Sequence, residues 1–155
     1  MKKSETYKVM TEKELHRQIK AKSLPSLKRK LQILFNEFIR LRDLSGDHFK
    51  CISCGQIKSE RFMHAGHYYA VGSYEGLRFD EDNCHGQCNH CNTFLHGNLI
   101  EYRENLPERI GFARFEKLKI KAGNYKRNGY KFSRFELELL IKEYIEKIKQ
   151  LKEGA

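Results

Sequence analysis

The chain has 155 residues and a formal net charge of +10, from 30 Lys and Arg against 20 Asp and Glu, and 39% of its residues are hydrophobic. This length predicts a single domain, and the composition excludes both a disordered chain and a membrane protein. No run of about 18 apolar residues is present, and the N-terminus lacks the apolar stretch of a secretory signal. We therefore expect a cytoplasmic protein without a membrane partner.

The basic residues are concentrated towards the two ends of the chain. Residues 1–50 carry 13 Lys and Arg against 6 Asp and Glu, residues 51–97 carry 3 against 5, and residues 98–155 carry 14 against 9. A slightly acidic centre therefore lies between two basic wings, which suits binding to a polyanion such as nucleic acid. A soluble basic protein with solvated lysine faces is the alternative interpretation.

Residues 1–22 are polar and rich in lysine, and we interpret them as a basic N-terminal arm that is loose or only partly helical. Residues 23–47 predict an N-terminal helix, because Ser23 offers N-cap chemistry and the segment 45–47 ends the pattern. Within it, apolar residues recur at alternating steps of four and three, at Leu27, Leu31, Leu34, Phe38 and Leu41. This spacing indicates one buried face on a helix of about 17 residues.

Residues 48–122 are the predicted zinc-stabilised core. Their first part, to residue 97, lacks a helical period and contains all five cysteines and six of the seven histidines, which indicates short strands and loops around a site. The chain becomes helical again at Leu99. Pro107 is expected in the first turn of a further helix that reaches about Lys121 and stops at Gly123-Asn124.

Residues 123–155 are predicted to be a basic, aromatic loop followed by a C-terminal helix. Ser133 and Glu136 have the spacing of a capping box, which marks the start of that helix. The helix carries a second apolar stripe with steps of four and three, at Leu137, Ile141, Tyr144, Ile148 and Leu151. Such a stripe most often packs against the body of the protein, although its period also permits a helical partner or self-association.

Two Cys-x-x-Cys pairs predict a metal centre. Cys51 pairs with Cys54, and Cys88 pairs with Cys91. Four thiolates suit tetrahedral zinc, and a site filled by four protein ligands is structural rather than catalytic. Cys84 is left over, and we interpret it as a packed free thiol.

The residues around these pairs carry a specific resemblance. A cysteine pair, a strand bearing His67, then Asn83, and a second pair followed by Asn92 resemble the layout of the HNH, or ββα-metal, endonucleases. More closely, the segments CISCG, MHAGHY, LRFDEDN, CNHCN and GNLIEYR resemble the phage lambda NinG (Rap) recombination protein family over roughly residues 26–115. We therefore expect an α+β fold with a small treble-clef, HNH-like centre flanked by an N-terminal helix and C-terminal helices.

The resemblance implies a metal-dependent DNA endonuclease that cuts branched recombination structures, including Holliday junctions and D-loops. His67 would be the general base, since a neutral imidazole can take a proton from the water that attacks phosphorus. Asn83 would hold the His67 loop through a hydrogen bond from its side chain to the backbone. Asn92 would offer its amide oxygen to a catalytic Mg²⁺ or Mn²⁺ ion. The acidic residues 80–82 are expected to form a turn and cap rather than a metal cluster.

Gly66 departs from the HNH pattern, because the residue before the base is commonly an acidic residue or histidine that binds the metal ion. We prefer His96 as the replacement ligand, since it lies four residues after Asn92 on the same face of an expected helix. His64 would point away from the base in a straight strand and reaches the ion only if the chain bends. His85 is a third option, and a histidine-rich set would favour metals such as Mn²⁺ over Mg²⁺.

Two groups of cations are predicted to bind DNA. One is interleaved with Tyr125, Tyr130 and Phe132, whose rings can stack on exposed bases, and the other lies at the start of the N-terminal helix. The predicted phosphate-binding residues are Lys126, Arg127, Lys131 and Arg134 in the first group, and Lys28, Arg29 and Lys30 in the second. Neither group has a base-reading signature, so we expect selectivity for DNA structure rather than for sequence. A solvated loop with its aromatic rings in the core is the alternative.

Two cuts are needed to resolve a four-way junction, so a homodimer is a reasonable hypothesis, and phage recombination proteins are candidate partners. Two other functions remain open. A non-catalytic, zinc-dependent DNA-binding module explains the cysteines and the charge, and Gly66 supports it. A recombination adaptor, whose helical stripes bind another protein, needs zinc only to fold its core.

Overall fold

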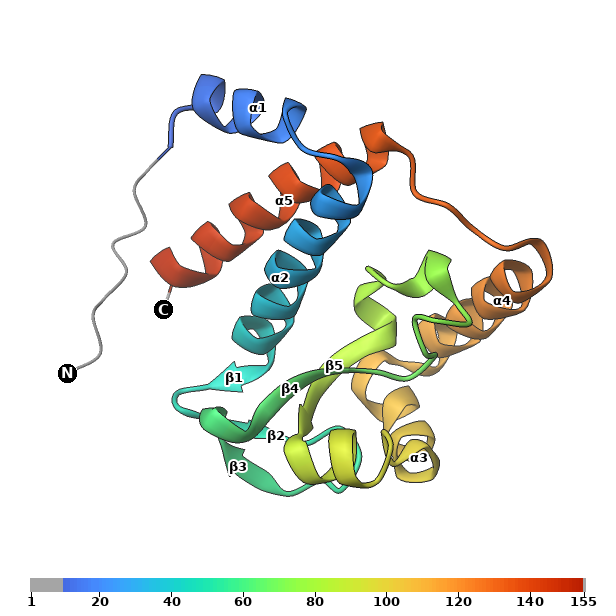
Figure 1. Ribbon diagram of the computed structural model, residues 1–155. Coiled ribbons are helices and arrows are strands. Elements are labelled where there is room, and N and C mark those ends of the chain that lie inside the picture. The colour runs from blue at the N-terminus through green and yellow to red at the C-terminus, as the bar shows by residue number, and fades with distance from the viewer. Residues whose placement is uncertain (1–9, 155) are drawn as a thin grey trace.

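The computed structural model describes residues 10–154, so residues 1–9 of the predicted basic arm lie outside the described residues. The fold mixes helices with two small antiparallel sheets, which confirms the predicted α+β class (Figure 1). No helix among the described residues is long and apolar enough to span a membrane. The elements are α1 (Glu12–Lys20), α2 (Leu24–Asp43), β1 (Leu44–Ser45), β2 (His48–Lys50), β3 (Ile57–Ser59), η1 (Glu60–Phe62), β4 (Met63–His67), η2 (Glu75–Leu77), η3 (Glu81–Asn83), β5 (Cys84–Cys88), the π-helix η4 (His90–Phe94), α3 (Leu99–Ile110), α4 (Phe112–Asn128) and α5 (Arg134–Glu153).

The N-terminal arm contains a defined helix. In α1 the side chain of Thr11 accepts a hydrogen bond from the backbone N–H of Glu14, which caps the helix start. Ile19, near the other end, is fully buried against the core that α2 and α5 form. Ile19, together with the partly buried Leu15, therefore attaches this helix to the body of the protein.

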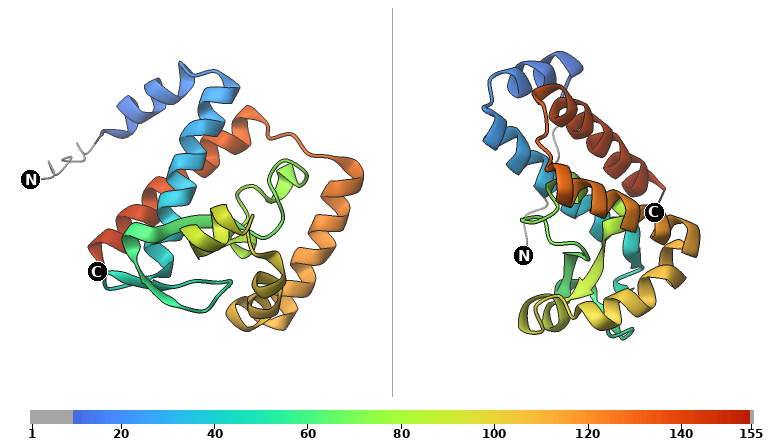
Figure 2. Two further views of the ribbon diagram at one scale, coloured as in Figure 1. Left: turned by 60° about the horizontal axis from the view of Figure 1, so that its bottom comes forward. Right: turned by 90° about the vertical axis from the view of Figure 1, so that its right-hand side faces the viewer.

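The two predicted apolar stripes pack against each other within one chain. α2 and α5 make the most extensive contact between any two elements, and Figure 2 shows them lying together on one side of the molecule. Leu27 and Leu31 of α2 are fully buried, as are Leu137 and Ile141 of α5. The predicted capping box of α5 is confirmed. Because this face of α5 is already covered, it is not available for a partner helix.

The buried face of α2 is broader than the predicted stripe. Phe35 and Ile39 are completely buried, whereas the predicted Leu34 and Leu41 are only partly buried. The helix also ends at Asp43, four residues before the predicted boundary, because β1 begins at Leu44. β1 and the following hairpin, β2–β3, form the first sheet.

The predicted start of helix at Leu99 is confirmed, but the predicted break between the next two helices and the predicted end of the second are wrong. Pro107 lies inside α3, and the break between α3 and α4 falls at Gly111, whose φ of +87° suits glycine alone. α4 then continues through Gly123 to Asn128. A single glycine costs a helix only about 1 kcal/mol, and burial of the neighbouring side chains of Ala122 and Tyr125 in the second core outweighs that cost. The predicted basic loop is therefore largely helical, and only residues 129–133 connect α4 to α5.

The hairpin β4–β5 forms the second sheet and lies between the α2–α5 pair and the α3–α4 pair (Figures 1 and 2). Its register pairs Met63 with Cys88 at one end and His67 with Cys84 at the other. Because side chains alternate along a strand, His67 lies on one face of the hairpin and His64 lies on the opposite face. The strand stays extended between them, without the bend that a shared metal site would need.

Candidate metal centre and its surroundings

The four cysteines of the two pairs meet at one point. Their sulfur atoms all lie within 4.8 Å of one another, and within residues 10–154 they are the one group of three or more His, Cys, Asp or Glu side chains that converges in this way. Sulfur ligands around a tetrahedral zinc ion lie about 3.8 Å apart, given Zn–S bonds of about 2.3 Å. The cluster could therefore hold a metal ion such as zinc. Gly55, with a φ of +70°, turns the backbone directly after the first pair.

Hydrogen-bond donors surround these sulfur atoms, as a thiolate site requires. The backbone N–H of Cys88 donates to Sγ of Cys51 at 3.3 Å, and Nδ2 of Asn98 donates to Sγ of Cys91 at 3.4 Å. Burial raises the pKa of Cys54, and it raises the pKa of Cys91 to about 12. These thiols hold their protons at neutral pH, so metal binding has to displace them.

His67 is held by the backbone of a distant segment. Its Nε2 donates a hydrogen bond to the carbonyl oxygen of Arg78 at 2.8 Å, and its ring stacks on Phe35 with a centroid distance of 6.0 Å. Burial lowers the pKa of His67 more than the bond to Arg78 raises it. The ring is therefore neutral at pH 7, with its proton on Nε2 and its lone pair on Nδ1. Nδ1 has only a weak contact with Sγ of Cys84, at 3.8 Å.

Asn83 organises the loop that follows His67. Its Oδ1 accepts a hydrogen bond from the N–H of Tyr69 at 2.8 Å, and its Nδ2 donates to the carbonyl oxygens of Tyr69 and Leu77 at 3.0 and 3.1 Å. The side chain is fully buried, so these three bonds satisfy groups that water cannot reach. This is the side-chain to backbone contact expected of Asn83, and its catalytic role stays a prediction.

Asn92 lies apart from these two residues. It belongs to η4, and its Nδ2 is 3.2 Å from Nδ1 of His64, on the hairpin face opposite to His67. His67 lies three positions after His64 along an extended strand, which is a distance of about 10 Å. The structure thus brings Asn83 to the His67 loop and brings Asn92 to His64, but it does not gather His67 and Asn92 at one point.

His96 is not one helical turn along from Asn92, so that prediction is wrong. The helix η4 ends at Phe94, and His96 is exposed with a φ of +49°. His85 is buried, and its Nδ1 lies 3.2 Å from the hydroxyl of Tyr102. Burial lowers the pKa of His85 to about 3, so it is a neutral residue of the core.

Gln87 occupies the space beside Gly66, and sequence reasoning missed this residue. The two positions lie on the same face of the hairpin, and a Cβ atom added at Gly66 would lie 2.9 Å from Cβ of Gln87 and still closer to its Oε1. Nε2 of Gln87 donates to Oγ of Ser53 at 2.6 Å and to the carbonyl of Gly97 at 2.5 Å, which fixes the side chain. No side chain fits at position 66 in this arrangement, so it cannot supply a metal ligand.

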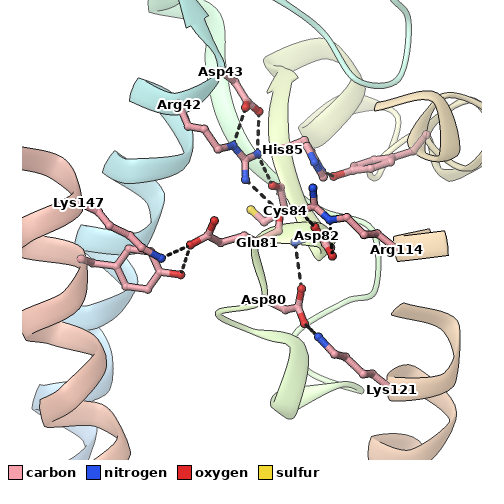
Figure 3. A network of polar contacts seen from close by, with 12 residues as sticks. Arg42, Asp43, Asp80, Glu81, Asp82, Cys84, His85, Arg114, Lys121 and Lys147 are labelled. Atoms are coloured by element: carbon pink, nitrogen blue, oxygen red, sulfur yellow. Dashed lines mark hydrogen bonds and ion pairs between the residues drawn. The ribbon is translucent and has the colours of Figure 1, made fainter. Parts of the chain in front are cut away.

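The acidic residues 80–82 form the expected turn and cap, and each also reaches a different cation. Asp80 accepts from the N–H of Asp82 at 3.0 Å, which caps η3. Figure 3 shows the three side chains pointing apart, towards two helices. Their ion pairs are Asp80 with Lys121 and Asp82 with Arg114 on α4, and Glu81 with Lys147 on α5. These ion pairs connect α4 and α5 to the segment that directly precedes Asn83.

Arg42 and Asp43 attach the end of α2 to the same region, and sequence reasoning missed this pair too (Figure 3). Arg42 donates to the carbonyl oxygens of Glu81 and Cys84 at 3.1 and 2.9 Å, and Asp43 accepts from the N–H of Gly86 at 2.7 Å. Burial alone would raise the pKa of Asp43, but the hydrogen bond and charge of Arg42 lower it. The adjacent opposite charges were the only local signal.

The predicted DNA-binding cations separate into two sets. Lys28, Arg29 and Lys131 line one groove, between the start of α2 and the α4–α5 connection. The other four do not line it. Arg134 binds Glu138 and the carbonyl of Lys22, and Arg127 binds Gly123 and Asn124 of α4. Lys126 lies over the ring of Tyr74, and Lys30 is half-buried, which lowers its pKa.

This fold and this centre define a small α+β protein built around four cysteines that could hold a metal ion. The family model described as "Bacteriophage Lambda NinG protein" matches residues 1–154, and the chain belongs to this family.

Proteins named ninG from several phages are similar to it. The protein of Salmonella phage P22 is 39% identical over 119 residues, which is 77% of this chain and 54% of that protein. The protein of Escherichia phage lambda is 37% identical over 117 residues, which is 76% of this chain and 53% of that protein. The chain thus spans about half the length of the curated relatives it matches. No solved structure matches it.

Proposed function

We propose that this protein is a metal-dependent, structure-selective DNA endonuclease of phage recombination that acts on Holliday junctions and D-loops. Membership of the NinG family supports this proposal. A ββα-metal core of the HNH, treble-clef type is supported by the order of elements, in which β4 and β5 are followed by η4 and the two cysteine pairs flank the hairpin. The zinc ion would fix this core, as a structural site does.

The observation that carries the proposal is the state of His67. A general base must be neutral and must present a lone pair to water, and the bond from Nε2 to the carbonyl of Arg78 leaves that lone pair on Nδ1, which contacts Sγ of Cys84 at 3.8 Å. Asn83 fixes the loop that leads to Arg78, so the tautomer is held by the fold. His67 would take a proton from water, and the hydroxide would attack phosphorus to leave 5′ phosphate and 3′ hydroxyl ends.

Asn92 and His64 are the side chains that would hold a Mg²⁺ or Mn²⁺ ion. In the structure Nδ2 of Asn92 faces His64, and a rotation of the amide would present its oxygen instead. Such an ion would neutralise charge on the phosphate. Water and phosphate oxygens would complete its ligands, as is usual for Mg²⁺.

The test is cleavage of labelled four-way junction, D-loop and plain duplex DNA with Mg²⁺ or Mn²⁺. Wild type should nick the branched substrates, and His67→Ala should bind them without cutting. His48→Ala is the matched control, because His48 is exposed on β2 and lies outside the β4–β5 hairpin. Cleavage by His67→Ala at the wild-type rate would overturn the assignment of the base.

One observation favours a second candidate, the non-catalytic zinc-dependent DNA-binding module. His67 and the Asn92–His64 pair lie on opposite faces of an extended strand, whereas one-metal hydrolysis needs the base and the ion on one phosphate. The same assay separates the two candidates, since a binding module retains DNA affinity but cuts with no divalent ion.

The apolar stripe of α5 packs on α2 within the chain, so neither an adaptor's partner protein nor a second copy of the chain can bind to it. A homodimer on the junction would use another face, and sizing the complex would detect it.

A further inference from the structure

One groove lies on the same side of the protein as the basic start of α2. It has a volume of about 680 Å³ and runs between α2 and residues 129–133, which cross from α4 towards the N-terminal end of α2 (Figure 1). Its floor is apolar, with Leu24, Pro25 and Leu137 among the lining residues. This volume is in the range of small-molecule sites, which are about 300–1,000 Å³.

The cations of the groove are not equivalent. Lys28 and Arg78 both bind the carboxylate of Glu75, at 2.6 and 3.0 Å. Arg29 and Lys131 are exposed and have no hydrogen-bond or ion-pair partner within residues 10–154. Two charges on opposite walls are therefore free for an anion, and two more are held back by one acidic residue.

Aromatic rings form one wall. The rings of Tyr130 and Phe132 lie 4.9 Å apart, and Phe132 is supported from behind by Phe79 at 5.2 Å. Both groove residues are half-buried, so part of each ring stays accessible. Rings next to unpaired cations are the combination that binds an unpaired nucleotide, since bases stack and phosphates need positive charge.

The groove also adjoins the His67 loop. The side chain of Arg78 lines the groove, and the carbonyl of the same residue accepts the hydrogen bond from His67. Gln32 lines the groove as well and accepts from Arg78 at 3.1 Å, while Phe35, one turn further along α2, stacks on His67. A ligand in the groove is thus separated from His67 by a single residue.

We propose that this groove binds an unpaired nucleotide of branched DNA, with its base against Phe132 and the apolar floor and its phosphates on Arg29 and Lys131. The inference rests on the proposed function and deepens it, because it names the feature that distinguishes a branch from plain duplex. An acidic peptide would satisfy the charges, but it would leave the aromatic wall and the link to His67 unused.

The test measures binding without added Mg²⁺ or Mn²⁺, so that cleavage plays no part. The probe is a duplex with one unpaired 2-aminopurine, compared with the same duplex fully paired. Arg29→Ala/Lys131→Ala should weaken binding of the unpaired probe about tenfold, lower the salt slope by about 2, and leave the paired duplex within about twofold. Lys117→Ala/Lys142→Ala removes the same charge from exposed positions of α4 and α5 and should change neither probe.

Two further variants change the charge of the groove. Glu75→Gln should strengthen binding of the unpaired probe several-fold, because it releases Lys28 and Arg78. Leu24→Glu adds a negative charge at the exposed first position of α2, where a carboxylate favours the helix, and should weaken it.

Equal losses in the groove and control double variants would overturn the proposal, as would 2-aminopurine fluorescence that is the same in Leu24→Glu and wild type. If every groove variant binds DNA normally, the groove belongs to another ligand, such as an acidic peptide. These readouts differ from those of the nuclease test. A protein that binds unpaired DNA through the groove but never cuts it would support this inference on binding and contradict the proposed nuclease function.

Discussion

The backbone carbonyl of Arg78 accepts a hydrogen bond from Nε2 of His67, at 2.8 Å. A carbonyl oxygen cannot donate, so this contact selects one tautomer of the neutral imidazole. The contact also joins a strand residue to the end of a loop that Asn83 holds closed. The chemistry available at His67 therefore depends on residues outside its strand.

The pH dependence of the proposed cleavage follows from the environment of His67. Burial lowers its pKa below the usual value of about 6.5, so the neutral base persists into mildly acidic solution. We expect the rate of junction cleavage to fall in acid with its midpoint below about pH 6.5. A profile with its midpoint at or above about 6.5 would contradict this expectation.

The stability of the fold should also fall in acid, because His85 is buried and neutral. Its folded-state pKa is about 3, whereas the unfolded chain takes up the proton near pH 6.5. The contribution of neutral His85 is complete above that pH and decreases by about 1.4 kcal/mol per pH unit below it. The free energy of unfolding, measured with urea between about pH 6 and pH 5, should depend on pH less steeply by this amount in His85→Gln than in the wild type. Equal slopes in both proteins would show that His85 titrates normally in the fold.

Removal of the metal should unfold the centre of the protein. We expect one zinc ion per chain in the wild type, and we expect a strong chelator or Cys91→Ser to remove zinc together with helical signal in circular dichroism. Cys84→Ser is the matched control, since Cys84 is also buried but lies outside the four-sulfur cluster. It should keep its zinc, and loss of zinc from this variant would instead make Cys84 a ligand.

The two asparagines of the predicted site should differ sharply in their effect on stability. Asn83→Ala removes the hydrogen-bond partner of the N–H and carbonyl of Tyr69 and one of the two hydrogen bonds to the carbonyl of Leu77, and we expect a loss of roughly 3 kcal/mol in the free energy of unfolding. Asn92→Ala removes one contact at a half-buried position and should cost less than about 1 kcal/mol. Chemical denaturation of both variants tests this, and equal losses would argue against the role of Asn83 in holding the loop.

Gly66 and Gln87 should behave as a coupled pair. Gly66→Ala forces its new methyl group against Gln87 and should destabilise the protein by about 1–3 kcal/mol, as overpacking does. The double variant Gly66→Ala/Gln87→Ala should recover part of that loss, although Gln87→Ala alone gives up two hydrogen bonds. Thermal unfolding of the three variants gives the coupling, and additive losses would rule the contact out.

Local patterns predicted the features that depend on neighbouring residues. The capping box at Ser133 and Glu136 was readable because both partners lie within one turn. The four-cysteine cluster was readable because each cysteine pair has the spacing that a metal ion requires. The two apolar stripes predicted helices for the same reason, although not the exact width of the buried face.

Features that depend on distant residues were not predictable in this way. The continuation of α4 through Gly123 is favoured by Ala122 and Tyr125, which pack in a core formed with other elements. The contact of Arg42 with Cys84 spans 42 residues of sequence. The separation of His67 from Asn92 appeared only once the hairpin register was known, because a strand position alone does not say where the following helix lies.

The close contact between Gly66 and Gln87 also restricts how this family can diverge. A lineage that gains an acidic metal ligand at position 66 must first replace Gln87 by a smaller residue, because the opposite order passes through an overpacked intermediate. Among homologues, glycine at position 66 should therefore occur with a long side chain at position 87. A carboxylate or imidazole at position 66 should occur with a short side chain at position 87. An alignment of the family would show this pairing as covariation of positions 66 and 87.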